Sequence, residues 1–106
     1  MNTLLIGLSL TGKKALIVGG GELALRKSRL LLKTTAHLIV VAPTAYAKFH
    51  ALAASGTITL ALKEYRSDYL DSGGIVFAAT GRGDIDTEVA TAAQLRNIPI
   101  NVPDKP

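Results

Sequence analysis

Residues 15–27 read Ala-Leu-Ile-Val-Gly-Gly-Gly-Glu-Leu-Ala-Leu-Arg-Lys, and this stretch decides the fold. A short apolar run ends in three glycines, and a helical pattern of apolar residues begins directly after them. This order is typical of a buried strand, a tight turn and a helix N-terminus. Gly19 fits the bend that leaves the strand, Gly21 lets a ligand approach the backbone, and Ala24 lets the helix pack closely on the strand.

The glycine turn predicts a dinucleotide site of the G-x-G-x-x-A type. The unpaired N–H groups of the first helical turn would point at bound phosphates, and the helix dipole favours their negative charge. We therefore expect the diphosphate of a dinucleotide to lie over Gly19, Gly20 and Gly21. A glycine motif of this kind is weak evidence when it stands alone, so its surroundings matter.

The composition fits one small domain over residues 1–106. Of the 106 residues 48% are hydrophobic, which is enough for one core and too few residues for two domains. No apolar run approaches the roughly 20 residues of a membrane span, and residues 1–10 lack the basic start and cleavage site of a signal peptide. Cysteine is absent, which excludes disulfides and thiolate metal sites and fits a reducing, cytoplasmic location.

The net charge of +4 makes the chain mildly basic. Aromatic residues make up 5% and tryptophan is absent, so little can stack on bases and no nucleic-acid partner is expected. One predicted helix carries much of the positive charge, at Arg26, Lys27, Arg29 and Lys33. We interpret it mainly as a solvated face, and the alternative is a surface that attracts a polyanionic ligand.

Short apolar runs alternate with helical patterns along the chain. Strands are predicted at residues 14–18, 37–42, 57–62, 75–80 and 98–102, and helices at 22–33, 45–54 and 84–97, with a helical turn at 68–70. Thr44, and Asp84 or Asp86, are the predicted N-caps of the last two helices. The alternation favours an α/β fold, a Rossmann-type doubly wound parallel sheet of about five strands in the order 3-2-1-4-5. Loops that follow the strands then meet at the edge where such sheets bind ligands.

The end of the second predicted strand departs from the standard NAD fingerprint. About 20 residues beyond the glycines, such sites carry an Asp or Glu that holds the adenosine ribose. Residues 40–44 here read Val-Val-Ala-Pro-Thr, with neither an acid nor an arginine for a 2′-phosphate. Backbone groups and the Thr44 hydroxyl would have to hold the ribose, and the alternative is a Rossmann-like shell without a ligand. His37 and His50 are not spaced as a metal pair, so no metal site is predicted.

Several linked motifs resemble the N-terminal domain of siroheme synthase, of the precorrin-2 dehydrogenase and sirohydrochlorin ferrochelatase family. The glycine segment with its leucine-rich helix, residues 16–32, is similar to the family pattern, and residues 40–43 repeat the family's strand ending. Residues 64–66, 68–70, 78–80 and 101–104 follow in the family's order and spacing. The resemblance covers nearly the whole chain and implies that the missing acid is a family trait.

The resemblance implies NAD as cofactor and a role for each matching position. Cofactor contacts are implied at Gly19, Gly20, Gly21, Glu22, Leu23, Pro43 and Thr44, with the nicotinamide half near Thr80. Asp104 is implied as the acidic residue at the reaction centre. Hydride transfer from precorrin-2 to NAD releases protons, and iron insertion needs deprotonated pyrrole nitrogens, so one carboxylate can serve both steps. From its spacing alone, Asp104 fits an exposed residue of a terminal turn better.

Two departures from the family keep alternatives open. Residues 81–84 read Gly-Arg-Gly-Asp where the family usually has acidic residues, which leaves the place of the nicotinamide open. In the family a further segment follows the region of Asp104 and builds the homodimer and much of the tetrapyrrole pocket, whereas this sequence stops at Pro106.

The leading hypothesis is an NAD-dependent precorrin-2 dehydrogenase domain of siroheme biosynthesis, with precorrin-2 as its substrate. Iron insertion with Fe²⁺, homodimer formation and activity of this chain by itself stay open. The alternative is a non-catalytic nucleotide-binding or sensing module with the same fold.

Overall fold

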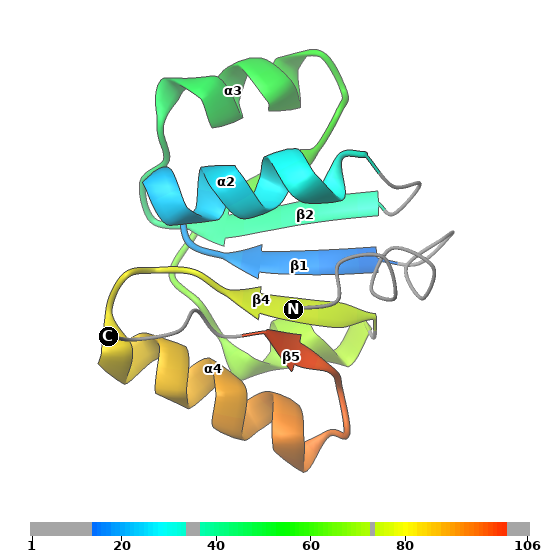
Figure 1. Cartoon of the computed structure of the whole chain (residues 1–106), viewed down its shortest axis with the longest axis vertical. Coiled ribbons are helices and arrows are strands. Elements are labelled where there is room, and N and C mark those ends of the chain that lie inside the picture. Colours follow the sequence, from blue (N-terminus) through cyan, green and yellow to red (C-terminus); the bar gives the residue numbers. More distant parts are fainter. Residues whose placement is uncertain (1–13, 34–36, 73, 102–106) are drawn as a thin grey trace.

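The computed structural model describes residues 14–33, 37–72 and 74–101, which form a five-stranded parallel sheet flanked by helices (Figure 1). The strands are β1 (Lys14–Val18), β2 (His37–Ala42), β3 (Thr59–Leu62), β4 (Ile75–Ala78) and β5 (Ile100–Asn101). The helices are α2 (Glu22–Leu31), α3 (Ala47–Ala54) and α4 (Gly83–Leu95), with a 3-10 helix η1 (Ser67–Ser72). The order β3-β2-β1-β4-β5 and the parallel pairing confirm the predicted Rossmann-type sheet.

Both faces of the sheet are buried, because β1 sends alternate side chains into two cores. Ala15 and Ile17 pack with residues of α2 and α3, whereas Leu16 and Val18 pack with residues of α4 and η1. None of the four is more than 5% exposed. Strands covered on both faces are apolar throughout, which explains why continuous apolar runs predict them correctly. No helix within the described ranges combines the length and apolar character that crossing a bilayer requires.

Three strands are shorter than the apolar runs that predict them. β3 begins at Thr59, β4 ends at Ala78, and β5 is the two residues Ile100–Asn101. The flanking residues Ile58 and Ala79 are still only 5% and 2% exposed, although they lie outside the strands. Burial therefore extends beyond the strand bounds, and at Ala79 the pairing does too, since its N–H donates to the carbonyl of Val18 at 2.9 Å.

The predicted cap at Thr44 is wrong. α3 begins at Ala47 after Tyr46, and no side chain caps its N-terminus. The reason lies in the loop that precedes the helix: the N–H of Tyr46 donates to the carbonyl of Gly20 at 2.8 Å. This bond holds the loop after β2 against the glycine turn, so the helix starts later than its local sequence predicts.

The predicted cap at Asp84 or Asp86 is also wrong. α4 begins at Gly83 after Arg82, again without a side-chain cap. Asp86 lies inside the first turn, only 2% exposed, and its carboxylate accepts the Thr80 hydroxyl proton at 2.7 Å. The carboxylate thus serves the loop before the helix and not the helix end.

Candidate functional site

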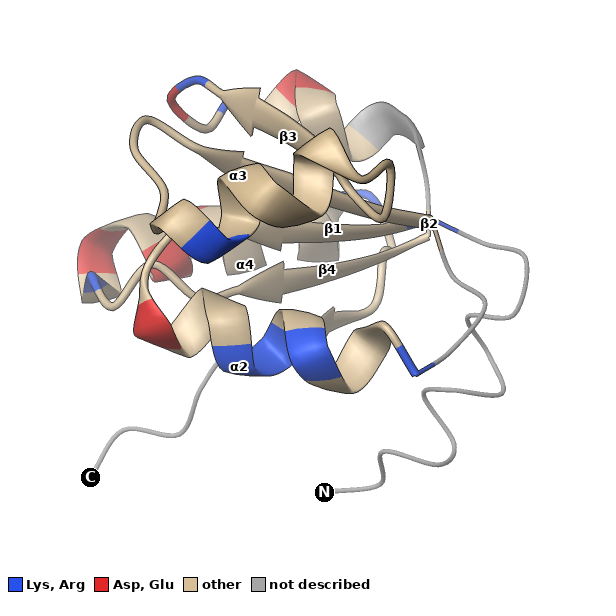
Figure 2. Cartoon of the chain, turned by 90° about the horizontal axis from the view of Figure 1, so that it is seen from above, with Lys and Arg blue, Asp and Glu red and all other residues tan. Residues whose placement is uncertain are grey.

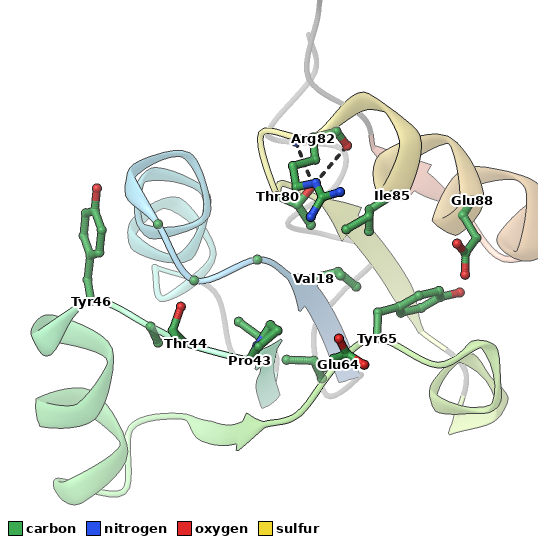
Figure 3. Close-up of a pocket in the computed structure, with 16 residues that line it drawn as sticks. Val18, Pro43, Thr44, Tyr46, Glu64, Tyr65, Thr80, Arg82, Ile85 and Glu88 are labelled. Carbon is green, nitrogen blue, oxygen red and sulfur yellow. Dashed lines mark hydrogen bonds between the residues drawn. The ribbon is translucent and has the colours of Figure 1, made fainter.

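Loops that follow β1, β2, β3 and β4 enclose a cavity of about 540 Å³ at the carboxyl edge of the sheet (Figure 3). Its walls are residues 18–21 at the end of β1 and beyond, 41–46 around the end of β2, 64 and 65 after β3, 80 and 82 after β4, and 85 and 88 on α4. The cavity lies beside the boundary between β1 and β4, where the strand order reverses. Doubly wound sheets bind their ligands at this point.

Two glycines of the turn let backbone segments approach each other closely. Gly19 has a φ of +142°, and a Cβ there would lie 2.2 Å from the carbonyl oxygen of Ala79. A Cβ at Gly20 would lie 2.2 Å from the carbonyl oxygen of Thr44. Gly19 therefore makes the bend that leaves β1, and Gly20 lets the loop after β2 close on the turn.

The third glycine leaves space for a ligand. A Cβ at Gly21 would meet only a ring carbon of Tyr46, at 4.0 Å, and no side chain caps α2 at this position. Glu22, Leu23 and Ala24 are the first three residues of α2. The N–H groups of a first helical turn have no acceptor within the helix. Open backbone, free donors and the positive end of the helix dipole make this corner suitable for an anion.

The structure brings most of the predicted cofactor positions to the cavity. Those that line it are Gly19, Gly20, Gly21, Pro43, Thr44 and Thr80. Glu22 and Leu23 stand beside it at the start of α2 without lining it: Leu23 packs against the core, and Glu22 pairs with Arg26 at 3.3 Å. Asp104, the predicted catalytic residue, lies outside the described residues.

Further residues line the cavity although the sequence patterns indicate no role for them. Glu64 and Tyr65 lie in the loop that follows β3, and that position is the signal by which they can be found. Ile85 and Glu88 lie one turn apart on α4, and both reach the cavity (Figure 3). The face of α4 that lines the cavity is set by how the helix packs on the sheet. The local sequence does not specify that packing.

Tyr65 carries a buried polar atom on this side of the cavity. Its hydroxyl has no hydrogen-bond partner among the described residues. Burial first, and then the Glu88 carboxylate, raise the pKa of the Tyr65 phenol above its ordinary value of 10.0. The phenol therefore stays protonated at neutral pH. A fully desolvated hydroxyl without a partner costs about 1–3 kcal/mol, and a partly buried one costs less.

A buried carboxylate organises the loop after β4. Oδ1 of Asp86 accepts the Thr80 hydroxyl at 2.7 Å and the Thr80 N–H at 3.1 Å. The Thr80 hydroxyl oxygen accepts the N–H of Arg82 at 3.0 Å. In solvent, the Arg82 guanidinium pairs with Asp84 at 3.3 Å. The N–H of Ile85, and then the charge of Arg82, lower the pKa of Asp84.

The basic residues of α2 lie apart from the cavity. Arg26, Lys27 and Arg29 follow one another along the helix (Figure 2), and neither they nor Lys33 line the cavity. Arg26 is 69% exposed in its pair with Glu22, and exposed pairs of this kind contribute little. These positions agree with a solvated face. Within the described part of the chain, no three His, Cys, Asp or Glu side chains gather so that they can hold a metal ion.

The sequence also matches known proteins over nearly its whole length. The model of a family described as putative NAD(P)-binding matches residues 6–106. The chain belongs to this family. It is 44% identical over 97 residues to the siroheme synthase of Pseudomonas entomophila, a match that covers 92% of this chain and 21% of that protein. It is 36% identical over 106 residues to the siroheme synthase of Psychrobacter arcticus, covering 100% of this chain and 19% of that protein.

A solved structure supports the same relationship. The precorrin-2 dehydrogenase SirC superposes with a TM-score of 0.74 at 26% identity, covering 88% of this chain and 45% of that chain. These matches confirm the resemblance to siroheme synthases and the Rossmann-type fold. The putative NAD(P)-binding domain described here spans about a fifth of the length of the siroheme synthases it matches, from 19% to 21% in the two cases above.

Proposed function

We propose that this chain is an NAD-dependent dehydrogenase domain of siroheme biosynthesis, which passes a hydride from precorrin-2 to NAD and so forms sirohydrochlorin. The observation that carries the proposal is the open corner at Gly21, where a Cβ would meet nothing nearer than 4.0 Å. Membership of the putative NAD(P)-binding family supports the class of cofactor. The matches to siroheme synthases and to SirC support the substrate.

The cavity fits a dinucleotide that spans the glycine turn. The diphosphate would lie over Gly19, Gly20 and Gly21. Its oxygens would accept hydrogen bonds from the N–H groups of Glu22 and Leu23. The adenosine half would extend along the loop after β2, over Pro43 and Thr44. The nicotinamide half would lie on the other side of β1, near Thr80. In this arrangement each predicted cofactor residue contacts the dinucleotide. Glu22 and Leu23 do so through their backbone N–H groups.

The side chains after β2 favour NAD over NADP. The lining residues there are Pro43, Thr44, Ala45 and Tyr46, and none of them is cationic. A 2′-phosphate at this point would lose its water without gaining a charged partner, which costs affinity. Arg82 is the cationic residue that lines the cavity within the described ranges, and it lies after β4, paired with Asp84.

The chemistry divides between cofactor and protein. When bound, NAD accepts the hydride, and the protein supplies position and a proton acceptor. Residues of the cavity would hold the dinucleotide so that its nicotinamide half faces the substrate. We assign the proton acceptor to Asp104. The same carboxylate would take protons from the pyrrole nitrogens if the chain also inserts Fe²⁺ into sirohydrochlorin.

Isothermal titration of the 106-residue chain with NAD and NADP tests the cofactor assignment. We expect NAD to bind in the micromolar-to-millimolar range common for such sites, and NADP to bind more weakly. A thermal melt provides an independent reading, since a ligand that binds only the folded state raises the midpoint. Absence of both heat and stabilisation at millimolar NAD would refute the proposal.

One observation favours a second candidate, a nucleotide-binding or sensing module without catalysis. The carboxylates of Glu64 and Glu88 line the cavity, and its cation Arg82 is paired with Asp84. Such walls repel a polycarboxylate macrocycle like precorrin-2. An assay of sirohydrochlorin formation from precorrin-2 and NAD separates the candidates. Turnover by this chain alone excludes the second, whereas NAD binding without turnover favours it.

A further inference from the structure

We infer that Asp86 is a positioning residue that makes Thr80 a pure hydrogen-bond acceptor towards the cavity, so that the site selects the carboxamide of NAD against a carboxylate. The inference rests on the proposed function, because it takes NAD as the ligand. It adds a determinant of specificity that lies behind the cavity wall and does not itself line the cavity.

Hydrogen bonds within the protein use nearly all of the donors and acceptors of Thr80. A threonine hydroxyl has one proton to donate and two lone pairs that accept. Two acceptors lie within reach of the proton: Oδ1 of Asp86 at 2.7 Å and the carbonyl oxygen of Arg82 at 3.2 Å. The carboxylate oxygen is nearer, and carboxylates form the stronger bond, so the proton points to Asp86.

One lone pair then remains. The N–H of Arg82 donates to the Thr80 oxygen at 3.0 Å and occupies the first lone pair. The Thr80 N–H is also taken, because it donates to Asp86 at 3.1 Å. A ligand group that meets the Thr80 side chain must therefore donate a proton to it.

Asp86 is well placed to keep this arrangement. It is 2% exposed and lies in the first turn of α4, so water does not compete for its oxygens and the helix dipole stabilises its charge. Nearby Asp84 differs, since its carboxylate is in solvent, in an ion pair whose side chains are 67% and 70% exposed. Asp84 therefore provides a matched control.

The topology places the nicotinamide half of a dinucleotide on this side. In doubly wound sheets the group that binds the adenosine ribose follows β2. The dinucleotide then crosses the point between β1 and β4 where the strand order reverses, and reaches the other half of the sheet. Thr80 follows β4, which pairs with β1 on the side opposite to β2. The carboxamide of the nicotinamide offers an NH₂ donor. A carboxylate in its place offers only acceptors and has no proton to donate to the Thr80 oxygen.

Comparison of NAD with nicotinic acid adenine dinucleotide, its carboxylate analogue, tests the inference by titration calorimetry. The unsubstituted chain should bind NAD at least about tenfold more tightly than the analogue. Asp86→Ala leaves the Thr80 proton only the more distant Arg82 carbonyl, at 3.2 Å, so the proton also turns into the cavity and this preference should fall. Asp86→Asn keeps an acceptor oxygen for Thr80 and should retain most of the preference. Asp84→Asn keeps both hydrogen bonds of Asp86 to Thr80, so any change it causes through the released Arg82 charge should be smaller than that of Asp86→Ala.

Two readouts distinguish positioning from a general structural role. ADP lacks the nicotinamide half, so its affinity should be the same for the unsubstituted chain and for Asp86→Ala. Thr80→Val has nearly the same shape without the hydroxyl, and it should lose the preference even if Asp86→Ala does not fold.

Each contrary result has its own meaning. An unchanged preference in Asp86→Ala or Thr80→Val overturns the inference while NAD binding still supports the proposed function. Equal losses of ADP and NAD affinity show a structural role and overturn it too. If Asp86→Asn loses the preference as fully as Asp86→Ala, charge and not proton orientation is responsible, and the inference fails. Absence of NAD binding by the unsubstituted chain overturns the proposed function and the inference with it.

Discussion

Substitution of Gly21 by alanine tests the proposed phosphate site while sparing the fold. The added methyl group would meet only a Tyr46 ring carbon, at 4.0 Å, which is ordinary van der Waals contact. The backbone of Gly21 is extended, with φ −104° and ψ −156°, so alanine adopts it without the strain of a positive φ. The methyl group projects into the space that a diphosphate would occupy.

The expected change in stability is small because two effects offset each other. Alanine is a poorer N-cap than glycine, by somewhat less than about 1 kcal/mol. Alanine also restricts the unfolded chain, which stabilises the folded state by about 0.4–1 kcal/mol. The free energy of unfolding should therefore change by less than about 1 kcal/mol. Loss of one hydrogen bond to a charged phosphate weakens binding by about 1.5–3 kcal/mol, so the Kd for NAD should rise about 10- to 150-fold.

Titration calorimetry with NAD and urea unfolding of the same samples measure the two quantities. Gly20→Ala is the matched control, because its Cβ would lie 2.2 Å from the Thr44 carbonyl oxygen and 2.9 Å from Ala42. We expect that variant to lose about 1–3 kcal/mol of stability through overpacking. An unchanged Kd in a folded Gly21→Ala chain would show that no phosphate rests at this corner, and the proposed site would be wrong.

Further predictions concern three other residues of the chain. Tyr65→Phe removes a buried, unpaired hydroxyl and should raise the free energy of unfolding by about 1 kcal/mol, whereas Tyr46→Phe, at an exposed ring, should not. The pKa of Tyr65 is raised in the folded state, so above pH 10.0 the unfolded chain loses the proton first and stability falls as pH rises; melts across this range should show a smaller alkaline loss for Tyr65→Phe. Asp104→Ala should abolish sirohydrochlorin formation and leave the Kd for NAD unchanged, and equal loss of both would indicate a structural role. Phe49→Ala empties a fully buried position between α3 and the sheet and should cost about 3–5 kcal/mol in urea unfolding, so a cost under about 1 kcal/mol would contradict the packing described.

The fold could be predicted because its signals are local. Residues 15–18 and 38–42 are apolar because helices cover both faces of the sheet, and both strands lie where the sequence places them. The order of the strands follows from right-handed crossovers and the alternation of strands with helices. The glycine turn could be predicted from Gly19, since a positive φ and close packing both require glycine there.

The features that the sequence did not predict depend on contacts between distant segments. Thr44 has the chemistry of a cap, but the Gly20 carbonyl binds the loop beside it and moves the start of α3. Asp86 has the same chemistry, and Thr80 takes its carboxylate instead. Glu88 reaches the cavity only because of how α4 packs on the sheet. Capping rules pair a side chain with backbone groups near it in the sequence. The folded chain also offers hydrogen-bond partners from distant segments.

The junction between the glycine turn and the loop after β2 is held by a main-chain hydrogen bond and by close backbone contact. The Tyr46 N–H bonds to the Gly20 carbonyl at 2.8 Å, and Gly20 lies directly against the Thr44 carbonyl, while the Thr44 side chain is exposed. Position 44 can therefore be redesigned without disturbing the scaffold. An engineer who wants the domain to accept phosphorylated dinucleotides has an anchoring point there for an arginine, at little risk to folding.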